Sequence, residues 1–215
     1  MLKDMEKWQE YFEKIVKEQP FVVYNSTWDI GAPETQAHCS LNAYLDYYCY
    51  KNYGAQVWTI ISMVLKPAVV VELGTAFGIR TCMLGKLNPK ATIYSTDNQK
   101  YQSLGANIEM GYLARLHNIP FTFYCGNSWE TKIDGKLNLC FIDADHSEEA
   151  VYKDSWWAWN NKDENSYLIC WDDYPLDTVK KGVDRFCREI NIDLKFIEGV
   201  PYVSTIDVNI EYSAL

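Results

Sequence analysis

The sequence Ala68-Val69-Val70-Val71-Glu72-Leu73-Gly74-Thr75-Ala76-Phe77-Gly78 determines the fold. It marks the point where the predicted secondary structure changes from helices to alternating strands and helices. A continuous apolar run of this kind is typical of a buried parallel strand. Gly74 allows a tight turn and a close approach to a ligand, and Gly78 permits close packing where a helix begins. The loop amides and the helix N-terminus can then face a ligand. We expect a strand, a ligand-binding turn and a helix here, although two glycines alone are equally consistent with a simple turn.

Strands and helices alternate along the rest of the chain. We expect further strands at 92–96, 121–125, 137–142, 167–171, 194–197 and 203–208. Helical spacing of apolar residues predicts helices at 79–87, 101–116, 147–160 and 179–190. The last two strands are joined by a link too short for a parallel crossover, so we expect them to be antiparallel. The order predicts an α/β fold, a doubly wound, mostly parallel seven-stranded sheet with a terminal antiparallel strand.

The first 65 residues have a different pattern. Apolar residues recur at helical spacing within 2–18, 41–50 and 57–65. We therefore divide the chain into an N-terminal helical extension, residues 1–65, and a ligand-binding core, residues 66–215. Such an extension would cover the ligand cleft or mediate contact in a homodimer.

Composition narrows the class of protein. The net charge of −9 and the lack of a Lys/Arg stripe argue against binding to nucleic acid. No apolar stretch is long enough to cross a membrane, and the charged N-terminus is unlike a signal peptide. The seven cysteines are scattered and form no CxxC, a pattern that suits reduced thiols in a cytoplasmic protein.

A second acid supports a ligand site beside the first turn. Asp97 ends the strand predicted at 92–96, where an acceptor-only carboxylate can take hydrogen bonds from ribose hydroxyls. Capping of the following helix is an alternative role, and one carboxylate can perform both. The spacing E-x-G-x-x-x-G differs from the G-x-G-x-x-G of dinucleotide-binding proteins.

The stretch from Val70 to Gly78 resembles the first motif of class I S-adenosylmethionine-dependent methyltransferases. By this resemblance Asp97 corresponds to their ribose-binding acid, and Gly126-Asn127-Ser128 is similar to the Gly-Asp-Ser that brackets the adenine, with Asn in place of Asp. The resemblance runs from about residue 55 to the C-terminus and implies S-adenosylmethionine as cofactor. The implied cofactor-binding residues are Glu72, Gly74, Thr75, Ala76, Phe77, Gly78, Asp97, Asn98, Asn127, Ser128 and Asp143.

Acidic residues follow two of the predicted strands. The run 139–142 leads into Asp143-Ala144-Asp145-His146, and the run 168–171 leads into Asp172-Asp173. If these strands are parallel neighbours, four carboxylates and an imidazole meet at one edge. Their repulsion favours a divalent cation, with Mg²⁺, Mn²⁺ or Ca²⁺ the usual partners of oxygen ligands. Helix capping is the alternative, and it explains one acid at each strand end but not two.

These acids resemble those of a metal-dependent branch of the methyltransferases, which includes catechol, caffeoyl-coenzyme A and antibiotic-sugar O-methyltransferases. The resemblance implies that Asp143, Asp172 and Asp173 hold the cation. It leaves two candidates for the catalytic base. His146 occupies the place of a lysine base in catechol-type enzymes, and Asp145 is the candidate in the sugar-modifying enzymes. His146 could instead make a structural hydrogen bond to a neighbouring carboxylate.

The sequence therefore predicts a methyltransferase that O-methylates a small hydroxylated acceptor with the help of a divalent cation, most simply Mg²⁺. Three alternatives remain open. The protein could be a nicotinamide-dinucleotide oxidoreductase on a similar sheet, it could bind a cofactor or metal without turnover, or its acids could serve another metal-dependent reaction, such as hydroxylation.

Overall fold

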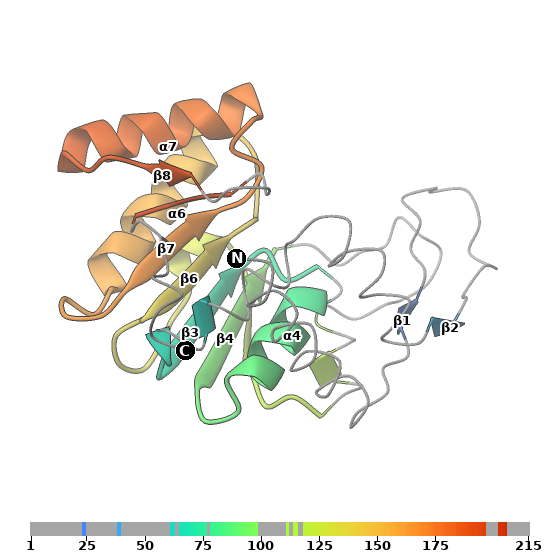
Figure 1. Cartoon of the computed structure of the whole chain (residues 1–215). Coiled ribbons are helices and arrows are strands. Elements are labelled where there is room, and N and C mark those ends of the chain that lie inside the picture. Colours follow the sequence, from blue (N-terminus) through green and yellow to red (C-terminus); the bar gives the residue numbers. More distant parts are fainter. Residues whose placement is uncertain are drawn as a thin grey trace, which may run out of the picture.

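The computed structural model describes residues 61–62, 65–76, 78–98, 111, 114–115, 118–196 and 202–205, and the backbone of two short strands. Those two, β1 (Val23–Tyr24) and β2 (His38–Cys39), pair antiparallel. The remaining elements form one seven-stranded sheet with helices against it (Figure 1). Its strands are β3 (Val69–Leu73), β4 (Thr92–Asp97), β5 (Thr122–Cys125), β6 (Leu139–Ile142), β7 (Leu168–Trp171), β8 (Lys195–Phe196) and β9 (Val203–Ser204). The helices are α4 (Ile79–Leu87), α6 (Glu148–Asn161), α7 (Asp177–Ile190) and the 3₁₀ turn η2 (Ser128–Glu130).

The strand order is β5-β4-β3-β6-β7-β9-β8, and β9 runs antiparallel to both of its neighbours. The pairs β3–β4, β4–β5, β3–β6 and β6–β7 are parallel. Strand order reverses between β3 and β6, because the chain moves outward from β3 to β5 and then returns to the other side of β3. In open α/β sheets this switch point is where ligands bind, beyond the carboxyl ends of the strands.

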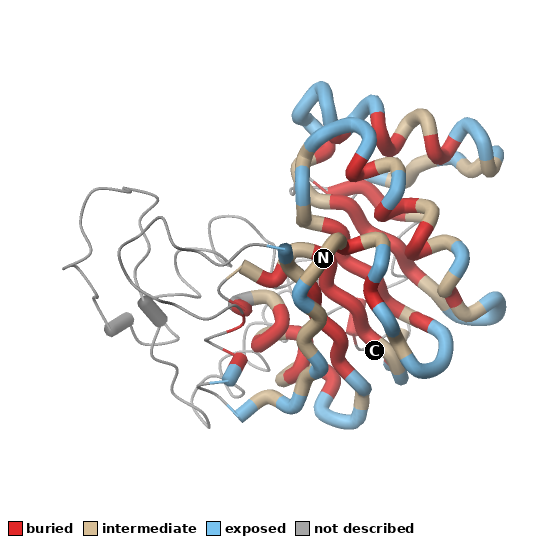
Figure 2. The backbone as a smooth tube through the Cα atoms, turned by 180° about the vertical axis from the view of Figure 1, so that it is seen from behind, coloured by how far each residue is buried: buried red, intermediate tan, exposed pale blue. Residues whose placement is uncertain are grey.

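Alternation along the strands directs side chains to two separate cores. Val71, Leu73 and Trp171 face α6 and α7, whereas Val70 and Phe141 face α4. Both faces of the central strands are therefore covered, which explains why β3, β6 and β7 are apolar throughout apart from Glu72. Figure 2 shows the resulting band of buried strands between more exposed helices and loops.

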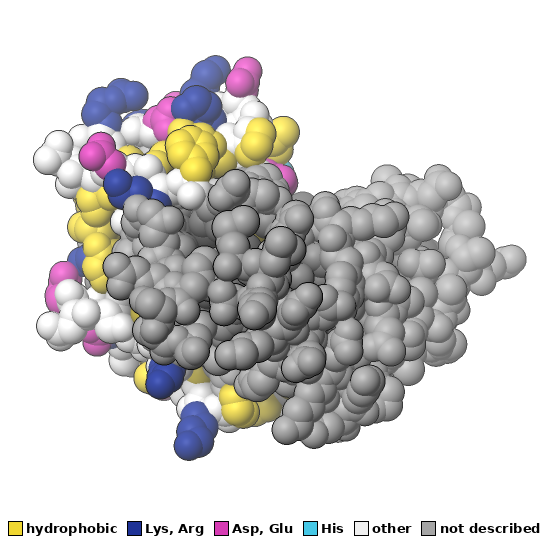
Figure 3. All heavy atoms as spheres, viewed as in Figure 1, with side chains coloured by type: hydrophobic (Ala, Val, Ile, Leu, Met, Phe, Trp, Pro, Cys, Tyr) yellow, Lys and Arg dark blue, Asp and Glu magenta, His cyan; other side chains and the backbone are white. Residues whose placement is uncertain are grey.

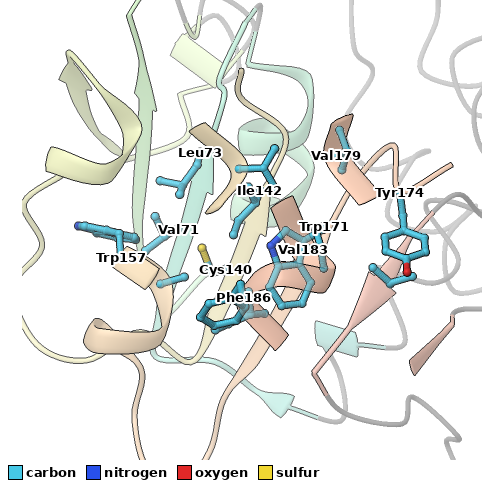
Figure 4. Packing of buried hydrophobic residues seen from close by; sticks show 14 of the residues in the cluster. Val71, Leu73, Cys140, Ile142, Trp157, Trp171, Tyr174, Val179, Val183 and Phe186 are labelled. Atoms are coloured by element: carbon cyan, nitrogen blue, oxygen red, sulfur yellow. The ribbon is translucent and has the colours of Figure 1, made fainter. Parts of the chain in front are cut away.

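The larger core lies between the sheet and α7. Phe186 on α7 is fully buried and packs against Trp171, with ring centroids 6.0 Å apart. Figure 4 shows these two rings beside Val183. The Trp171 indole nitrogen donates to the Ser155 hydroxyl at 2.9 Å, so the buried polar atom of this large side chain has a partner.

The predicted fold class is confirmed, including the antiparallel closing pair β8–β9. Helix α4 has the predicted bounds, and the other described elements begin or end within a few residues of prediction. The helices predicted at 2–18 and 41–50 lie outside the described residues, as do most of those at 57–65 and 101–116 and the last part of the strand at 203–208. The division into an extension and a core stays a prediction.

Within the part of the chain that the structure describes, no helix is long and apolar enough to cross a membrane. Figure 3 shows Lys and Arg side chains close to Asp and Glu side chains on the described surface at the top of the view. The contacts are pairs of opposite charge: Lys180 with Asp184 at 2.6 Å, and Arg185 with Glu149 at 3.1 Å.

Candidate functional site

The turn after β3 lies against the turn after β6. Gly74 has φ +99°, and a Cβ on this residue would overlap the carbonyl oxygen of Asp143. Only glycine fits both the backbone angle and this close approach. The Asp143 amide donates to the Leu73 carbonyl at 2.8 Å. The two strand ends are thus fastened together at the switch point of the sheet.

The loop amides are used within the protein. Those of Gly74 and Thr75 donate to the Thr96 carbonyl at 2.9 and 3.0 Å, and that of Gly78 donates to Thr75 at 2.7 Å. The Ala76 amide donates to Asp97 Oδ2 at 2.9 Å. This differs from the expectation that the loop amides face a ligand, because the end of β4 accepts the amides of Gly74, Thr75 and Ala76 and the loop itself accepts that of Gly78. Phe77 lies outside the described residues.

Glu72 lies beneath the loop, in a buried polar group on the α4 side of the sheet. It is 2% exposed, and the Thr81 hydroxyl donates to Glu72 Oε2. The Ser95 hydroxyl connects Thr81 (3.0 Å) with Thr75. Burial raises the pKa of Glu72 to about 8, with the Thr81 hydrogen bond opposing the rise. Glu72 therefore supports the loop from below and holds a proton at neutral pH.

Asp97 and the turn after β5 border the same loop. Asp97 is half-buried, and Asn98 beside it is exposed. The Gly126 amide donates to the Asp97 carbonyl at 3.1 Å, which joins the ends of β4 and β5. The side-chain nitrogen Nδ2 of Asn127 donates to Glu130 Oε2 at 3.3 Å, while Ser128 is buried at the start of η2. The predicted cofactor residues that the structure describes thus lie at the ends of β3, β4 and β5, except Asp143, which follows β6.

The acids after β6 and β7 separate into two groups. The first contains Asp143, His146 and Asp173, whose possible ligand atoms all lie within 4.8 Å of one another. His146 Nε2 is 3.4 Å from Asp143 Oδ1 and 3.6 Å from Asp173 Oδ2. Two carboxylate oxygens and an imidazole nitrogen at this spacing can bind one divalent cation. Asp143 and Asp173 are therefore brought together as the sequence predicts.

Asp172 belongs to the second group, which the sequence did not predict. Its Oδ2 is 3.4 Å from Nη2 of Arg80, a residue of the first turn of α4. Burial raises the pKa of Asp172 above its ordinary value, and the Arg80 charge opposes the rise. Of the three predicted cation ligands, Asp172 is the one that the structure does not bring into the group with His146.

The two base candidates differ in environment. A hydrogen bond to Asp143 raises the pKa of His146 above its usual value, although partial burial opposes the rise. Asp145 is exposed and accepts a hydrogen bond from the Ser147 amide at 2.7 Å. Hydrogen bonds from Ser147 lower the pKa of Asp145. Asp145 thus bonds the residue at the N-cap of α6 and does not cap a first-turn amide itself, and its lowered pKa makes it the weaker base of the two.

Asp154 is, like Glu72, a buried acid, but the sequence analysis did not identify it. It lies on α6 with no exposed surface, and neither carboxylate oxygen meets the geometry of a hydrogen bond with any described residue. Burial raises the pKa of Asp154 to about 7, and the nearby Ser128 side chain opposes the rise. An acid on the sheet-facing side of a helix is the pattern that could have revealed it, since Ala150, Val151 and Trp157 of α6 are also buried.

Comparisons with known proteins point to one class of enzyme. Residues 71–174 match a family described as a methyltransferase domain. No curated protein matches the chain. Among solved structures, an S-adenosylhomocysteine-bound methyltransferase from Podospora anserina, PaMTH1, is 15% identical with a TM-score of 0.55, covering 70% of this chain and 76% of that one.

Two O-methyltransferases are also similar in structure. One is from Bacillus cereus in complex with S-adenosylhomocysteine, at 16% identity and TM-score 0.53, covering 78% of this chain and 87% of that chain. The other is TomG from Streptomyces achromogenes, involved in tomaymycin synthesis and bound to S-adenosylmethionine, at 12% identity and TM-score 0.51. That match covers 72% of this chain and 80% of TomG. At these identities the structural likeness concerns the fold.

Proposed function

We propose that this chain is a class I S-adenosylmethionine-dependent methyltransferase and that it methylates an oxygen of a small hydroxylated acceptor with the help of a divalent cation; its match to a methyltransferase-domain family supports the proposal. The observation that carries the proposal is a contact at the switch point of the sheet between the turn after β3 and the acid group after β6 and β7. The glycine turn after β3 touches Asp143, and Asp143 belongs to the acid group after β6 and β7. A donor bound at the turn and an acceptor bound at the acids would be neighbours, as direct methyl transfer requires.

The cofactor would lie across the ends of β3, β4 and β5. Asp97 would accept hydrogen bonds from the ribose hydroxyls, and Asn127 with Ser128 would border the adenine. Gly74, Thr75, Ala76 and Gly78 would shape the floor, with Glu72 supporting them from below. The methyl group on the sulfonium supplies the electrophile, so the protein has to align the acceptor oxygen with it and exclude water.

Asp143 and Asp173 are the carboxylates that would hold the cation, and their spacing fits this role. A bound cation would lower the pKa of the acceptor hydroxyl and fix the position of its oxygen. We assign the general base to His146 rather than Asp145. His146 lies beside Asp143 and Asp173, where the acceptor oxygen would be bound, whereas the exposed Asp145 accepts the Ser147 amide and its pKa is lowered.

Binding measurements test the cofactor assignment. We expect isothermal titration to detect S-adenosylhomocysteine and not NAD⁺, since the loop lacks the dinucleotide-binding glycine spacing. Binding of NAD⁺ alone would support the oxidoreductase alternative and refute the proposal. Transfer of a deuterated methyl group from S-adenosylmethionine to catechols, sugars or other hydroxylated compounds, read by mass spectrometry, tests the reaction itself. Binding of S-adenosylhomocysteine without any methylated product would favour the non-catalytic alternative.

The roles of His146 and Asp145 can be separated with two matched variants. If His146 is the base, His146→Asn lowers kcat by about 10²–10⁴-fold and leaves Mn²⁺ affinity nearly unchanged. If His146 is mainly a cation ligand, the same variant weakens Mn²⁺ binding instead. Asp145→Asn should change kcat only slightly. A large loss of kcat in Asp145→Asn with normal folding would transfer the base to Asp145.

A further inference from the structure

Arg80 reaches from the first turn of α4 across β6 to the end of β7. Its guanidinium carbon lies 3.7 Å from the centre of the Phe141 ring. One terminal nitrogen is 3.4 Å from Asp172 Oδ2, and the other donates to the Tyr202 hydroxyl at 3.2 Å. Phe141 and Tyr202 themselves meet edge to face, with centroids 5.6 Å apart. Contacts from three separate segments therefore fix the plane and position of this cation.

Asp172 is turned toward Arg80 and engaged at both oxygens. Its Oδ1 accepts the Asp173 amide at 2.7 Å, and its Oδ2 faces Arg80. The Asp172 side chain is 13% exposed, whereas that of Asp173 is 42% exposed. A carboxylate in this position already has a counter-charge and two hydrogen-bond donors.

The backbone separates the two adjacent acids. Asp173 has φ +51°, in the left-handed region that few residues other than glycine adopt. This angle turns the chain directly after β7, so that Asp173 faces His146 while Asp172 faces the α4 side. Asp172 therefore contacts Arg80 and Asp173 contacts His146. A cation bound beside His146 can be coordinated by Asp173 but not by Asp172.

We propose that Arg80 is a positioning residue that supplies the counter-charge of Asp172 from within the protein, so that a divalent cation at this edge is held without Asp172. The proposal rests on the cation site of the proposed function. It assigns to Arg80 a second effect: its positive charge disfavours binding of a cation beside Asp143 and Asp173. The site then resembles a three-carboxylate site in sequence but presents two carboxylates to the ion.

Removal of charges one at a time and then in a pair tests this assignment. Mn²⁺ affinity of the full chain with S-adenosylhomocysteine bound can be measured by electron paramagnetic resonance. Arg80→Met should tighten Mn²⁺ binding about fivefold, because it uncovers the Asp172 charge. Asp172→Asn should weaken binding about fivefold, because it leaves the Arg80 charge uncompensated. The double variant, Arg80→Met with Asp172→Asn, should return to within about threefold of the wild type.

Direct ligands must behave differently. Asp173→Asn removes a ligand and should weaken Mn²⁺ binding by more than about tenfold, whether or not Arg80 is present. If Asp172 also binds the ion, the double variant will show a similar loss, and the proposal is overturned. An Arg80→Met variant that binds Mn²⁺ no more tightly than the wild type would also overturn it.

Two conservative variants guard against a purely structural effect. Arg80→Lys keeps the positive charge and should keep Mn²⁺ affinity close to that of the wild type. Tyr202→Phe removes the hydrogen bond to Arg80 without changing charge, so it should lower the unfolding temperature without changing Mn²⁺ affinity. A fivefold change in Tyr202→Phe would show that packing, not charge, controls the site. If the wild type binds no Mn²⁺, the cation site and this proposal both fail, while binding of S-adenosylhomocysteine would leave the methyltransferase assignment intact.

Discussion

Glu72→Gln should make the protein more stable at neutral pH and should do so increasingly as the pH rises. Glu72 is 2% exposed, and its pKa is raised by burial from 4.5 to about 8. Below pH 4.5 the acid is protonated in both the folded and the unfolded chain, so burial carries no ionisation penalty. Above pH 4.5 the unfolded chain loses the proton while the folded chain keeps it, and stability is lost until the pH passes the folded pKa. Gln has the shape of the protonated acid and does not ionise.

The size of the effect follows from the width of this pH window. Each pH unit between the two pKa values corresponds to about 1.4 kcal/mol. From pH 5.5 to pH 8 the free energy of unfolding of Glu72→Gln, relative to that of the wild type, should rise by roughly 3 kcal/mol. The Thr81 hydroxyl can donate to the amide oxygen of Gln as it does to the carboxyl, so the contact beneath the loop is kept.

Urea unfolding at several pH values, followed by tryptophan fluorescence, measures this difference. Other titrating groups cancel because both proteins contain them. Asp193→Asn removes a carboxyl group at an exposed position and serves as the matched control for the loss of an acid. A Glu72→Gln difference that does not grow with pH would refute the raised pKa. It would mean that the buried carboxylate is ionised and balanced by the Arg80 charge.

Three further outcomes follow from the geometry. Gly74→Ala should lower the unfolding temperature strongly and weaken binding of S-adenosylhomocysteine, because its Cβ would overlap the Asp143 carbonyl. Gly135→Ala has a similar φ of +88°, but its Cβ would meet the nearest atom at 3.8 Å, so it should cost only about 1–2 kcal/mol. Phe186→Ala should lower the free energy of unfolding by about 3–5 kcal/mol, against less than about 1 kcal/mol for Phe196→Ala, whose side chain is 71% exposed. Asp97→Asn can still accept the Ala76 amide and should fold normally, but it should weaken binding of S-adenosylhomocysteine about tenfold in titration calorimetry. Equal effects in either matched pair, or unchanged affinity in Asp97→Asn, would contradict these assignments.

The order of strands and helices could be predicted because β3, β6 and β7 are mostly apolar runs with a clear end. The residue at which each strand begins could not be predicted. Hydrophobicity shows that a residue is buried but does not show whether its backbone pairs with a neighbouring strand. Leu137 is fully buried, yet β6 begins two residues later, at Leu139. The side chain of Asn138 accepts the amides of Ala68 and Val69 at 3.0 and 3.1 Å, in addition to the backbone bond from the Asn138 amide to the Val69 carbonyl at 3.0 Å. A side chain that imitates the backbone leaves no pattern in hydrophobicity.

Which residues meet at one edge of the sheet was predictable where most strands end, although not for Asp172. Asp97, Asp143 and Asp173 are such cases, because parallel strands deliver their carboxyl ends to one edge. The role of Glu72 was less visible, although alternation places it on the α4 face, opposite Val71 and Leu73. The pairing of Arg80 with Asp172 was not predictable. It depends on the angle of α4 to the sheet and on a left-handed backbone angle at Asp173, and neither has a local pattern in the sequence.

The contact between Gly74 and Asp143 links the two halves of the proposed reaction. Asp143 is held by the β3 ladder through its amide, and its carbonyl lies where a side chain on residue 74 would be. The Asp172 amide donates in turn to Ile142 at 3.0 Å, so the acids after β6 and β7 are positioned from β3 outward. A donor bound at the turn and an oxygen bound near Asp143 would therefore keep a fixed separation without any moving segment. Because misplacement of reacting atoms by about 1 Å can cost a hundredfold in rate, substitutions at Gly74 should impair methyl transfer even when cofactor binding is restored by higher concentration.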